Sequence, residues 1–384
     1  MKQNRTLIYW SPFIDKVATV KATYNSVQSL NRYSRSQIKC KIIDVFGEWK
    51  SFKYFGLKKD LFYSLKDIPQ LNKFSSKGYL KSRLKYLLIF FICFFPLKNF
   101  LKKEKPDFLV IHLVTSLPLL LNLIFNFKTK IILRISGKPK LNFFRYFFWK
   151  ICLKKVYKVT CPTEETLQYL KKKNLIENKK LFLLYDPIID MKEFMSKKKQ
   201  GILKKNNHKN EFYLAIGRLT KQKNFKFLIK AFKEIHKTDK NINLVILGDG
   251  ENYKSLKLLI ERFKLQDKIT LAGYKNNIFE YSLNCKAFIL TSLWEDPGFV
   301  LIEAMLSNAL ILSSDCSSGP KEIVGNNRGV LFKSNSKEDF IEKFNEINLL
   351  SNEDKFKKIV NAKKFIKKFT LVSHYKNFSK IIYD

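Results

Sequence analysis

Apolar residues in the first half of the chain form short compact runs that alternate with longer helical patterns. The compact runs, which predict strands, lie at 7–10, 41–45, 108–112, 131–135 and 159–161. Helical periodicity covers the intervening stretches 20–30, 80–101, 117–125 and 143–153. Strands that alternate with longer helical stretches are typical of βαβ units, so the pattern predicts a parallel sheet.

The pattern breaks after residue 188 and then resumes as a second series. Residues 189–210 are rich in Lys and Asn and have little apolar periodicity, so we expect a linker there. Further strands are predicted at 212–216, 244–247, 269–272, 287–290, 310–313 and 330–332, with helices at 225–236, 253–263 and from 300 onward. The predicted fold class is therefore α/β, with doubly wound parallel sheets in two domains, over 1–188 and 211–365. The end of the chain, 366–384, has a helical pattern, and we expect it to cross back to the first domain.

The charge is strongly positive and raises the question of an anionic partner. Lys and Arg number 73 against 33 acidic residues, a formal net charge of +40. Such a surface attracts phosphates, nucleic acid or anionic lipid. The abundance of Lys, Asn, Ile and Phe is also what an AT-rich genome would produce, and no RNA-binding or zinc-finger motif occurs. The sequence therefore predicts no specific nucleic-acid partner.

The six cysteines lack the spacing of a metal site, so we expect no metal and free thiols in a reducing cytoplasm.

The longest apolar run, 86–97, is flanked by Lys and Arg on both sides. It is too short for a membrane span, which needs about 20 residues. Two interpretations stay open, an interfacial helix on an anionic leaflet and a buried core helix. The first predicts peripheral contact with the inner face of the cell membrane through residues 81–105.

A basic turn follows the first strand of the second domain. After Gly217, a residue type that eases a tight turn, come Arg218 and Lys223, and then a helix begins. Arginine offers a planar fork for paired phosphate oxygens, lysine offers a point charge, and a helix N-terminus adds N–H donors. The turn is therefore a candidate diphosphate site, although a basic loop in a basic protein is the alternative.

Two acids accompany a second strand-to-helix loop. Glu295 lies before Pro297 and Gly298, and Glu303 lies in the helix that follows. Ionised carboxylates accept hydrogen bonds from sugar hydroxyls, and the amides of 298–300 would face an anion. The alternative is a loop acid followed by a helix acid that the macrodipole stabilises.

Taken together, these motifs resemble the GT4-type glycosyltransferases with the GT-B fold, two facing Rossmann-like domains with a cleft between them. The resemblance covers about 210–335. The matching motifs are Gly217-Arg218 with Lys223, Leu247-Gly248-Asp249-Gly250, Leu271-Ala272-Gly273, the pair Glu295 and Glu303 within 294–305, and Gly319-Pro320-Lys321-Glu322-Ile323-Val324 followed by Gly329.

The resemblance implies a role for each matched residue. Arg218 and Lys223, beside Gly217, would hold the donor diphosphate and stabilise the leaving group. Glu295 would contact the donor sugar and Glu303 the ribose. The remaining donor-site residues would be Gly298, Phe299 and Val300 along the phosphate and sugar, with Gly273 and Tyr274 near the nucleobase. The family retains the anomeric configuration and usually needs no metal or other cofactor.

The first half matches the family less well. The glycine-rich loop that commonly follows the first strand is absent from 10–15. His112, at a predicted strand end, is the candidate for a histidine near the sugars, although a lone histidine is more often structural. Arg134, Ser136 and Lys138 follow another strand and are candidates for binding an acceptor phosphate or sugar.

We therefore expect a metal-independent retaining glycosyltransferase. It would move a sugar from a UDP- or GDP-sugar donor to a glycan or lipid-linked acceptor, in cell-envelope polysaccharide biosynthesis. The domain over 1–188 would bind the acceptor and the domain over 211–365 the donor. The alternatives are a GT-B nucleotide-sugar epimerase and a non-enzymatic basic protein that binds nucleic acid or membrane. A glycosidase is a further alternative, since two carboxylates could act as acid and base.

Overall fold

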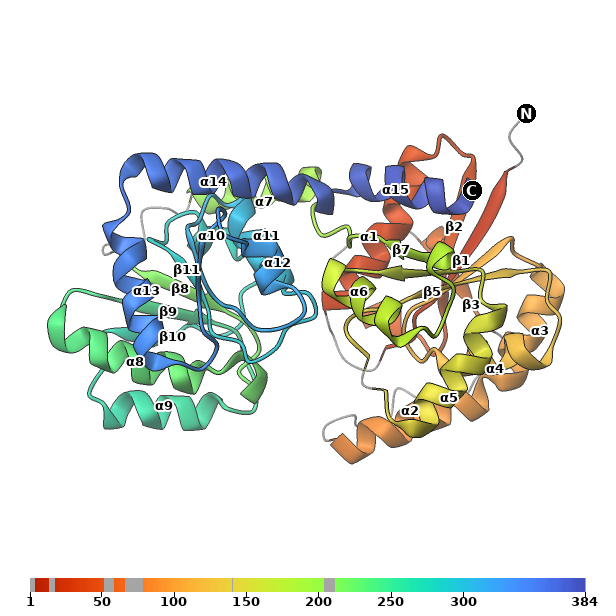
Figure 1. Ribbon diagram of the computed structural model, residues 1–384, viewed down its shortest axis with the longest axis horizontal. Helices are drawn as coiled ribbons and strands as arrows, with labels where there is room; N and C mark the ends of the chain where they lie inside the picture. The colour runs from red at the N-terminus through yellow and green to blue at the C-terminus, as the bar shows by residue number, and fades with distance from the viewer. Residues whose placement is uncertain are drawn as a thin grey trace. The chain divides into compact units, whose positions relative to one another are not determined.

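The chain divides into two compact units, each built around one parallel sheet (Figure 1). The computed structural model describes residues 4–13, 18–51, 59–65, 79–139, 141–203 and 211–383. Unit 1 consists of Met1–Pro187 and Leu371–Asp384, and unit 2 of Ile188–Thr370. The predicted α/β class with two doubly wound parallel sheets is confirmed.

Seven strands form the sheet of unit 1, in the order β3-β2-β1-β4-β5-β6-β7. They are β1 (Arg5–Trp10), β2 (Ile38–Asp44), β3 (Phe62–Ser64), β4 (Phe108–Ile111), β5 (Lys130–Arg134), β6 (Lys158–Cys161) and β7 (Leu181–Leu183). The strand order reverses between β1 and β4, which makes that position the switch point of the sheet. The apolar runs predicted all of these strands except β3 and β7, which have three residues each.

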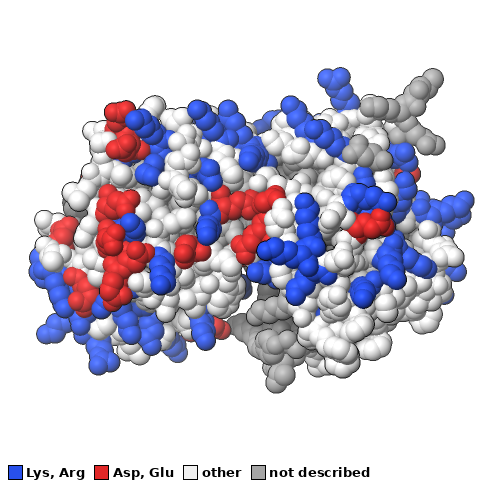
Figure 2. Space-filling model, viewed as in Figure 1, with Lys and Arg blue, Asp and Glu red and all other residues white. Residues whose placement is uncertain are grey.

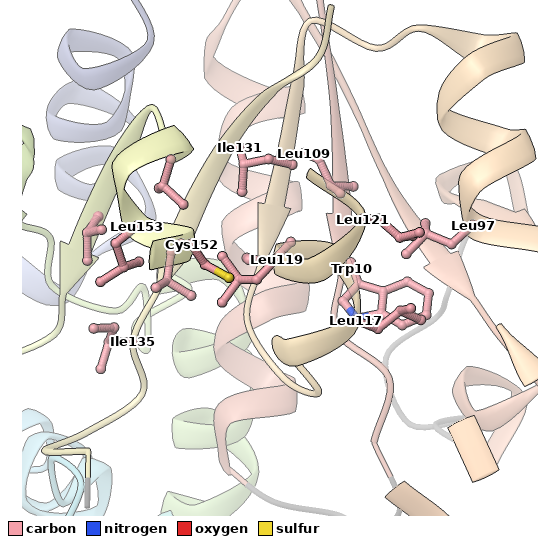
Figure 3. Packing of buried hydrophobic residues seen from close by; sticks show 14 of the residues in the cluster. Trp10, Leu97, Leu109, Leu117, Leu119, Leu121, Ile131, Ile135, Cys152 and Leu153 are labelled. Carbon is pink, nitrogen blue, oxygen red and sulfur yellow. The ribbon is translucent and has the colours of Figure 1, made fainter. Parts of the chain in front are cut away.

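Helices cover both faces of this sheet. They are α1 (Ala18–Tyr33), α2 (Tyr79–Ile92), α3 (Phe94–Glu104), α4 (Ser116–Ile124), α5 (Phe143–Cys152), α6 (Glu164–Lys173) and α15 (Leu371–Tyr383). Side chains alternate along a strand, so Trp10 of β1 packs with α3, α4 and α5 in one apolar cluster (Figure 3). Tyr9 belongs to a second cluster with α1 and α15. The last helix therefore completes one core of unit 1.

The predicted single helix over 80–101 is wrong in one respect, because it breaks at Cys93 into α2 and α3. The two pieces meet at 45°. Pro96 gives the physical reason, since a proline lacks the N–H that would bond the carbonyl four residues earlier, at Ile92. Ile89 and Leu97 are buried while Phe91 is exposed, so the run lies partly in the core and partly at the surface.

Within the described ranges no single helix is long and apolar enough to cross a membrane. The α2–α3 pair passes the test of length and composition only when its two bent halves are taken together.

Unit 2 contains a six-stranded sheet with the order β10-β9-β8-β11-β12-β13. Its strands are β8 (Tyr213–Ile216), β9 (Leu244–Leu247), β10 (Ile269–Leu271), β11 (Phe288–Leu290), β12 (Ile311–Ser314) and β13 (Val330–Phe332). Its helices are α7 (Met191–Leu203), α8 (Phe225–Thr238), α9 (Tyr253–Arg262), α10 (Phe279–Ser282), α11 (Phe299–Leu306), α12 (Pro320–Val324), α13 (Lys337–Leu349) and α14 (Asn352–Ile366). The strand order reverses between β8 and β11, the switch point of this sheet.

The linker predicted over 189–210 is wrong over most of its length, because α7 lies there. Phe194 packs edge-on against Phe279, with ring centroids 5.0 Å apart. Gly201 lies so close to α10 that a β-carbon would sit 3.1 Å from the backbone nitrogen of Glu280. The helix is anchored by few side chains among many lysines, which leaves no clear apolar period in the sequence. Residues 204–210 lie outside the described residues.

Candidate functional site

Two loops emerge side by side at the switch point of the unit 2 sheet, one after β8 and one after β11. Hydrogen bonds join them directly: the amide of Leu293 donates to the carbonyl of Gln222 at 2.8 Å, and Gln222 Nε2 donates to the Trp294 carbonyl at 2.9 Å. Thr291 Oγ1 also donates to the carbonyl of Lys223, at 2.9 Å. In open α/β sheets, ligands bind outside the carboxyl ends of strands at such a point.

An ion pair between a half-buried lysine and a buried glutamate lies where the loops meet. Lys223 Nζ lies 2.5 Å from Glu295 Oε1, and both side chains are largely shielded from solvent. Ser292 Oγ donates to the same oxygen, also at 2.5 Å. Two of the predicted site residues, 72 positions apart in sequence, are thus brought into direct contact. One carboxylate oxygen of Glu295 thus contacts both Lys223 and Ser292.

Arg218 is the second cation of this site, and it is exposed. Within the described residues, its guanidinium has no hydrogen-bond or salt-bridge partner. The backbone of Gly217, just before it, lies against the methylenes of Lys223, where an added β-carbon would meet them at 3.0 Å. The loop therefore pairs a half-buried lysine, held by a carboxylate, with an uncommitted arginine that offers a fork for an anion.

Three glycines lock the ends of β8, β9 and β10 together. The amide of Gly217 donates to Leu247, and that of Gly248 donates to Gly273, each at 2.9 Å. Gly248 has φ +138°, and a β-carbon on it would lie 1.9 Å from the carbonyl oxygen of Gly217. These glycines thus permit close backbone contact as well as turns. Tyr274, which follows Gly273, is highly exposed at this edge.

Helix α11 begins at the second loop, as the sequence predicted. Gly298, with φ +91°, precedes it and lies against the side chain of Glu295, where a β-carbon would be 3.4 Å from Cγ. Phe299 is buried and Val300 is half-buried. At the start of a helix the backbone amides have no partner within the helix, so the amides of these two residues are the groups that could bind a ligand. Glu303 lies in the second turn of the same helix and is half-buried.

His112 occupies the switch point of the unit 1 sheet. Its amide donates to the carbonyl of Trp10 at 3.0 Å, and its Nδ1 lies 2.9 Å from Thr23 Oγ1. Arg134 Nη1 lies 3.1 and 2.9 Å from the two ring nitrogens. Burial, and then the Arg134 charge, hold the pKa of His112 well below its usual range, so the ring is neutral at pH 7.

Arg134 is buried instead of facing solvent, contrary to what an acceptor site would need. Asp186 pairs with it, and burial lowers the pKa of Arg134 to about 10, so it stays charged at neutral pH. The structure thus brings Arg134 to His112. Ser136 is half-buried, while Lys138 is exposed and lies 3.6 Å from Glu165.

No cluster of three or more His, Cys, Asp or Glu that could hold a metal ion occurs among the described residues.

The family comparison covers most of unit 2. Residues 196–365 match the model of the glycosyl transferases group 1. This part of the chain is therefore similar to the group 1 glycosyltransferases. The paired loops around Lys223 and Glu295 lie inside the matched region.

Relatives and solved structures extend the comparison beyond this domain. An uncharacterised glycosyltransferase of Methanocaldococcus jannaschii is 32% identical over 240 residues, 58% of this chain and 59% of the relative. N-acetylgalactosamine-N,N'-diacetylbacillosaminyl-diphospho-undecaprenol 4-alpha-N-acetylgalactosaminyltransferase of Campylobacter jejuni is 28% identical over 248 residues, 62% of this chain and 65% of the relative. The matches thus span about three fifths of the length of these curated relatives. The crystal structure of Anabaena HepE in complex with UDP and glucose superposes with a TM-score of 0.68 at 15% identity, covering 98% of this chain and 99% of that one. The fold is that of the GT-B glycosyltransferases.

Sequence reasoning missed the residues that hold the site residues in place. Ser292 hydrogen-bonds Glu295, Gln222 ties the two loops, and Asp186 pairs with Arg134. Ser292 lies three positions before Glu295, and a serine at that spacing from a candidate acid was the one local signal. Asp186, just before Pro187, looks like an ordinary turn residue, and only the fold brings it to Arg134.

Proposed function

We propose that the chain is a retaining glycosyltransferase that moves a sugar from a UDP- or GDP-sugar to a glycan or lipid-linked acceptor. The observation that carries this is the largely shielded Lys223–Glu295 pair beside the uncommitted Arg218, at the switch point of the unit 2 sheet. A cationic fork next to a carboxylate suits a ligand with a diphosphate at one end and hydroxyls at the other.

Each residue of the site would have a distinct part in donor binding. Arg218 would bind diphosphate oxygens bidentately, Lys223 would supply a second charge, and Glu295 would accept from a sugar hydroxyl. The amides at the start of α11 would face the phosphate. The remaining contacts would be Glu303 with the ribose, and Gly273 and Tyr274 with the nucleobase.

The reaction is a substitution at the anomeric carbon. The bond from that carbon to the diphosphate oxygen breaks, and the acceptor hydroxyl oxygen bonds to the same face of the sugar. The hydroxyl proton passes to the departing diphosphate. Arg218 and Lys223 would stabilise the charge that develops on the leaving group, so we propose that no metal is needed.

The roles of the unit 1 residues are less direct. His112 is neutral because of its burial, and its ring nitrogens contact Thr23 and Arg134, so it would fix the end of β4 beside a bound sugar. Ser136 and Lys138 would contact the acceptor. Arg134 would act through His112, since its side chain is buried against that ring.

The comparisons support the choice of donor and acceptor. The name of the Campylobacter jejuni relative includes a diphospho-undecaprenol acceptor, and the Anabaena structure holds UDP and glucose. We therefore propose a role in cell-envelope polysaccharide biosynthesis, at the inner face of the membrane, with contact to anionic lipid through residues 81–105. The epimerase and nucleic-acid alternatives are not favoured by these comparisons. Product formed without any acceptor would indicate an epimerase.

The test is the transfer rate of Arg218→Ala, with Lys221→Ala as the matched control. Arg218 and Lys221 are both exposed cations of the same loop, so neither change should unfold the protein. Loss of a charge that contacts the leaving diphosphate should lower the rate by about 10²-fold or more, and Lys221→Ala should leave it near wild type. Circular dichroism checks the fold. Equal rates for Arg218→Ala and wild type would refute the proposal.

A further inference from the structure

The outer side of the helix layer α2–α5 is unusually apolar. The layer buries Ile89, Leu97 and Trp149 against the unit 1 sheet. Its opposite side would be polar in an ordinary soluble protein. Instead it exposes Leu84, Leu87, Phe91, Phe95, Ile124, Phe143, Phe144, Phe147 and Ile151. In Figure 2 the surface over α4 and α5 is largely uncharged, and Lys and Arg side chains border it.

Helix α5 presents these side chains as a ridge. Phe143, Phe147 and Ile151 recur every four residues and so line one face, opposite the buried Cys152. The ring centroids of Phe143 and Phe147 are 4.7 Å apart. Phe144, beside them, is 82% exposed. No apolar partner within the described residues covers this ridge.

A second stripe runs along α2 and continues into α3. Leu84, Leu87, Phe91 and Phe95 are spaced by three or four residues, so they follow one face across the bend at Cys93. Helices α3, α4 and α5 contact one another in sequence. The two stripes therefore lie on the outer side of one continuous layer.

The charge around this layer is almost entirely positive. From α2 to α5 the sequence has two acidic residues, Glu104 at the end of α3 and Asp107 just before β4. Lys98 Nζ lies 4.9 Å from the centre of the Phe125 ring, and Arg145 Cζ lies 5.9 Å from the centre of the Trp149 ring. Cationic groups are thus in direct contact with aromatic rings of the layer. Further cations of the layer and its flanks are Lys102, Lys103, Lys105, Lys150, Lys154 and Lys155.

This combination points to an anionic bilayer as the occupant. Aromatic side chains are favoured at the boundary between lipid headgroups and acyl chains. The negative charge of the headgroups would attract the Lys and Arg residues that surround the apolar layer. A second copy of the chain would bring like charges together around the patch, which opposes pairing. The α2–α3 pair also has the length and composition of a membrane element.

We propose that the α5 ridge, together with the outer stripe of α2 and α3, inserts into the interface of an anionic membrane. Helix α5 begins directly after the loop that carries Ser136 and Lys138 at the carboxyl end of β5. The most exposed aromatics of the helix layer, Phe143 and Phe144, lie at that end of α5. Insertion therefore holds this loop at the lipid surface. The inference extends the membrane contact beyond 81–105 and rests on the proposed function only for the lipid-linked acceptor.

The test is flotation of the full chain with vesicles of phosphatidylcholine, with and without phosphatidylglycerol. Wild-type protein should float with the anionic vesicles. Phe144→Glu should lower the partition coefficient by about tenfold or more, because it removes apolar burial and adds a repelled charge. The matched control is Phe356→Glu, at a 67% exposed phenylalanine of α14 in unit 2. It should bind like wild type.

Three results would overturn the inference: no flotation of wild type with anionic vesicles, equal binding by Phe144→Glu and wild type, or an equal loss in the control. A dimeric wild type that Phe144→Glu makes monomeric, with unchanged vesicle binding, would assign the ridge to a second copy. Binding of UDP and GDP, measured without lipid, keeps the two proposals separate. It should be the same for Phe144→Glu and wild type, and its absence from both would refute the donor site alone.

Discussion

His374 is held in the core of unit 1 by a chain of hydrogen bonds that fixes its tautomer. Its Nδ1 lies 2.9 Å from the carbonyl oxygen of Tyr185, which can only accept, so Nδ1 carries the proton. Nε2 therefore accepts from Ser26 Oγ at 2.6 Å, and Ser26 in turn accepts from the hydroxyl of Tyr9 at 2.6 Å. Burial lowers the pKa of His374 to about 3. The folded protein thus holds a neutral imidazole.

This histidine predicts a pH dependence of stability. The unfolded chain binds a proton at about pH 6.5, and the folded state does so only far below that, so stability is complete above this range and falls as the pH drops. The slope should be about 1.4 kcal/mol per pH unit for His374, and His112 adds to it with the same sign. Hydrogen exchange in α1 and α15 at pH 7 and pH 5 measures it. A His374→Asn variant should show a shallower slope, and identical slopes would contradict the assignment.

At the residue scale, a sequence pattern shows which side chains could bind a ligand better than it shows what surrounds each of them in the fold. Lys223 and Glu295 could be singled out because each lies where a strand gives way to a helix, and the structure joins them. The burial of Arg134 could not be foreseen, since it depends on Asp186 arriving from another part of the chain. A partner that is distant in sequence leaves no local pattern.

At the scale of elements, strands built from buried apolar residues were predictable, whatever their length. β9 and β13 begin and end where the apolar runs do. β3 has only three residues, of which none is fully buried, so its composition carries little signal. Helix α7 could not be predicted because its sequence is rich in lysine and has no apolar period. It contacts α10 through Phe194 and Gly201. The bend at Cys93, in contrast, had a visible cause in Pro96.

The interlocked strand ends predict unequal costs for two glycine substitutions. Gly248→Ala would place a β-carbon 1.9 Å from the Gly217 carbonyl oxygen, whereas at Gly273, with φ +70°, no atom lies within 4 Å. Gly273→Ala should cost about 1 kcal/mol of backbone strain. Gly248→Ala should cost at least about 2 kcal/mol more, because neighbouring backbone must move. Denaturant unfolding of the two variants measures the difference, and equal stabilities would show that the loops do not interlock as described.

At the scale of the whole molecule, the net charge and the specific site contribute separately to the binding of a nucleoside diphosphate. The net charge of +40 would attract nucleoside diphosphates weakly and without preference for any one surface. The switch-point site predicts something narrower, that one exposed arginine among many cations governs binding. This contrast allows a general electrostatic attraction to be told apart from a built diphosphate site.

The most direct measurement is calorimetric titration of UDP and GDP, in a buffer with EDTA, into wild type, Arg218→Ala and Lys221→Ala. The wild type should bind one nucleoside diphosphate per chain without metal, and Lys221→Ala should match it. Arg218→Ala should bind at least about tenfold more weakly, since a charge-assisted bidentate contact is lost. Equal weakening by both variants, or no binding by the wild type, would contradict a donor site formed by Arg218, Lys223 and Glu295.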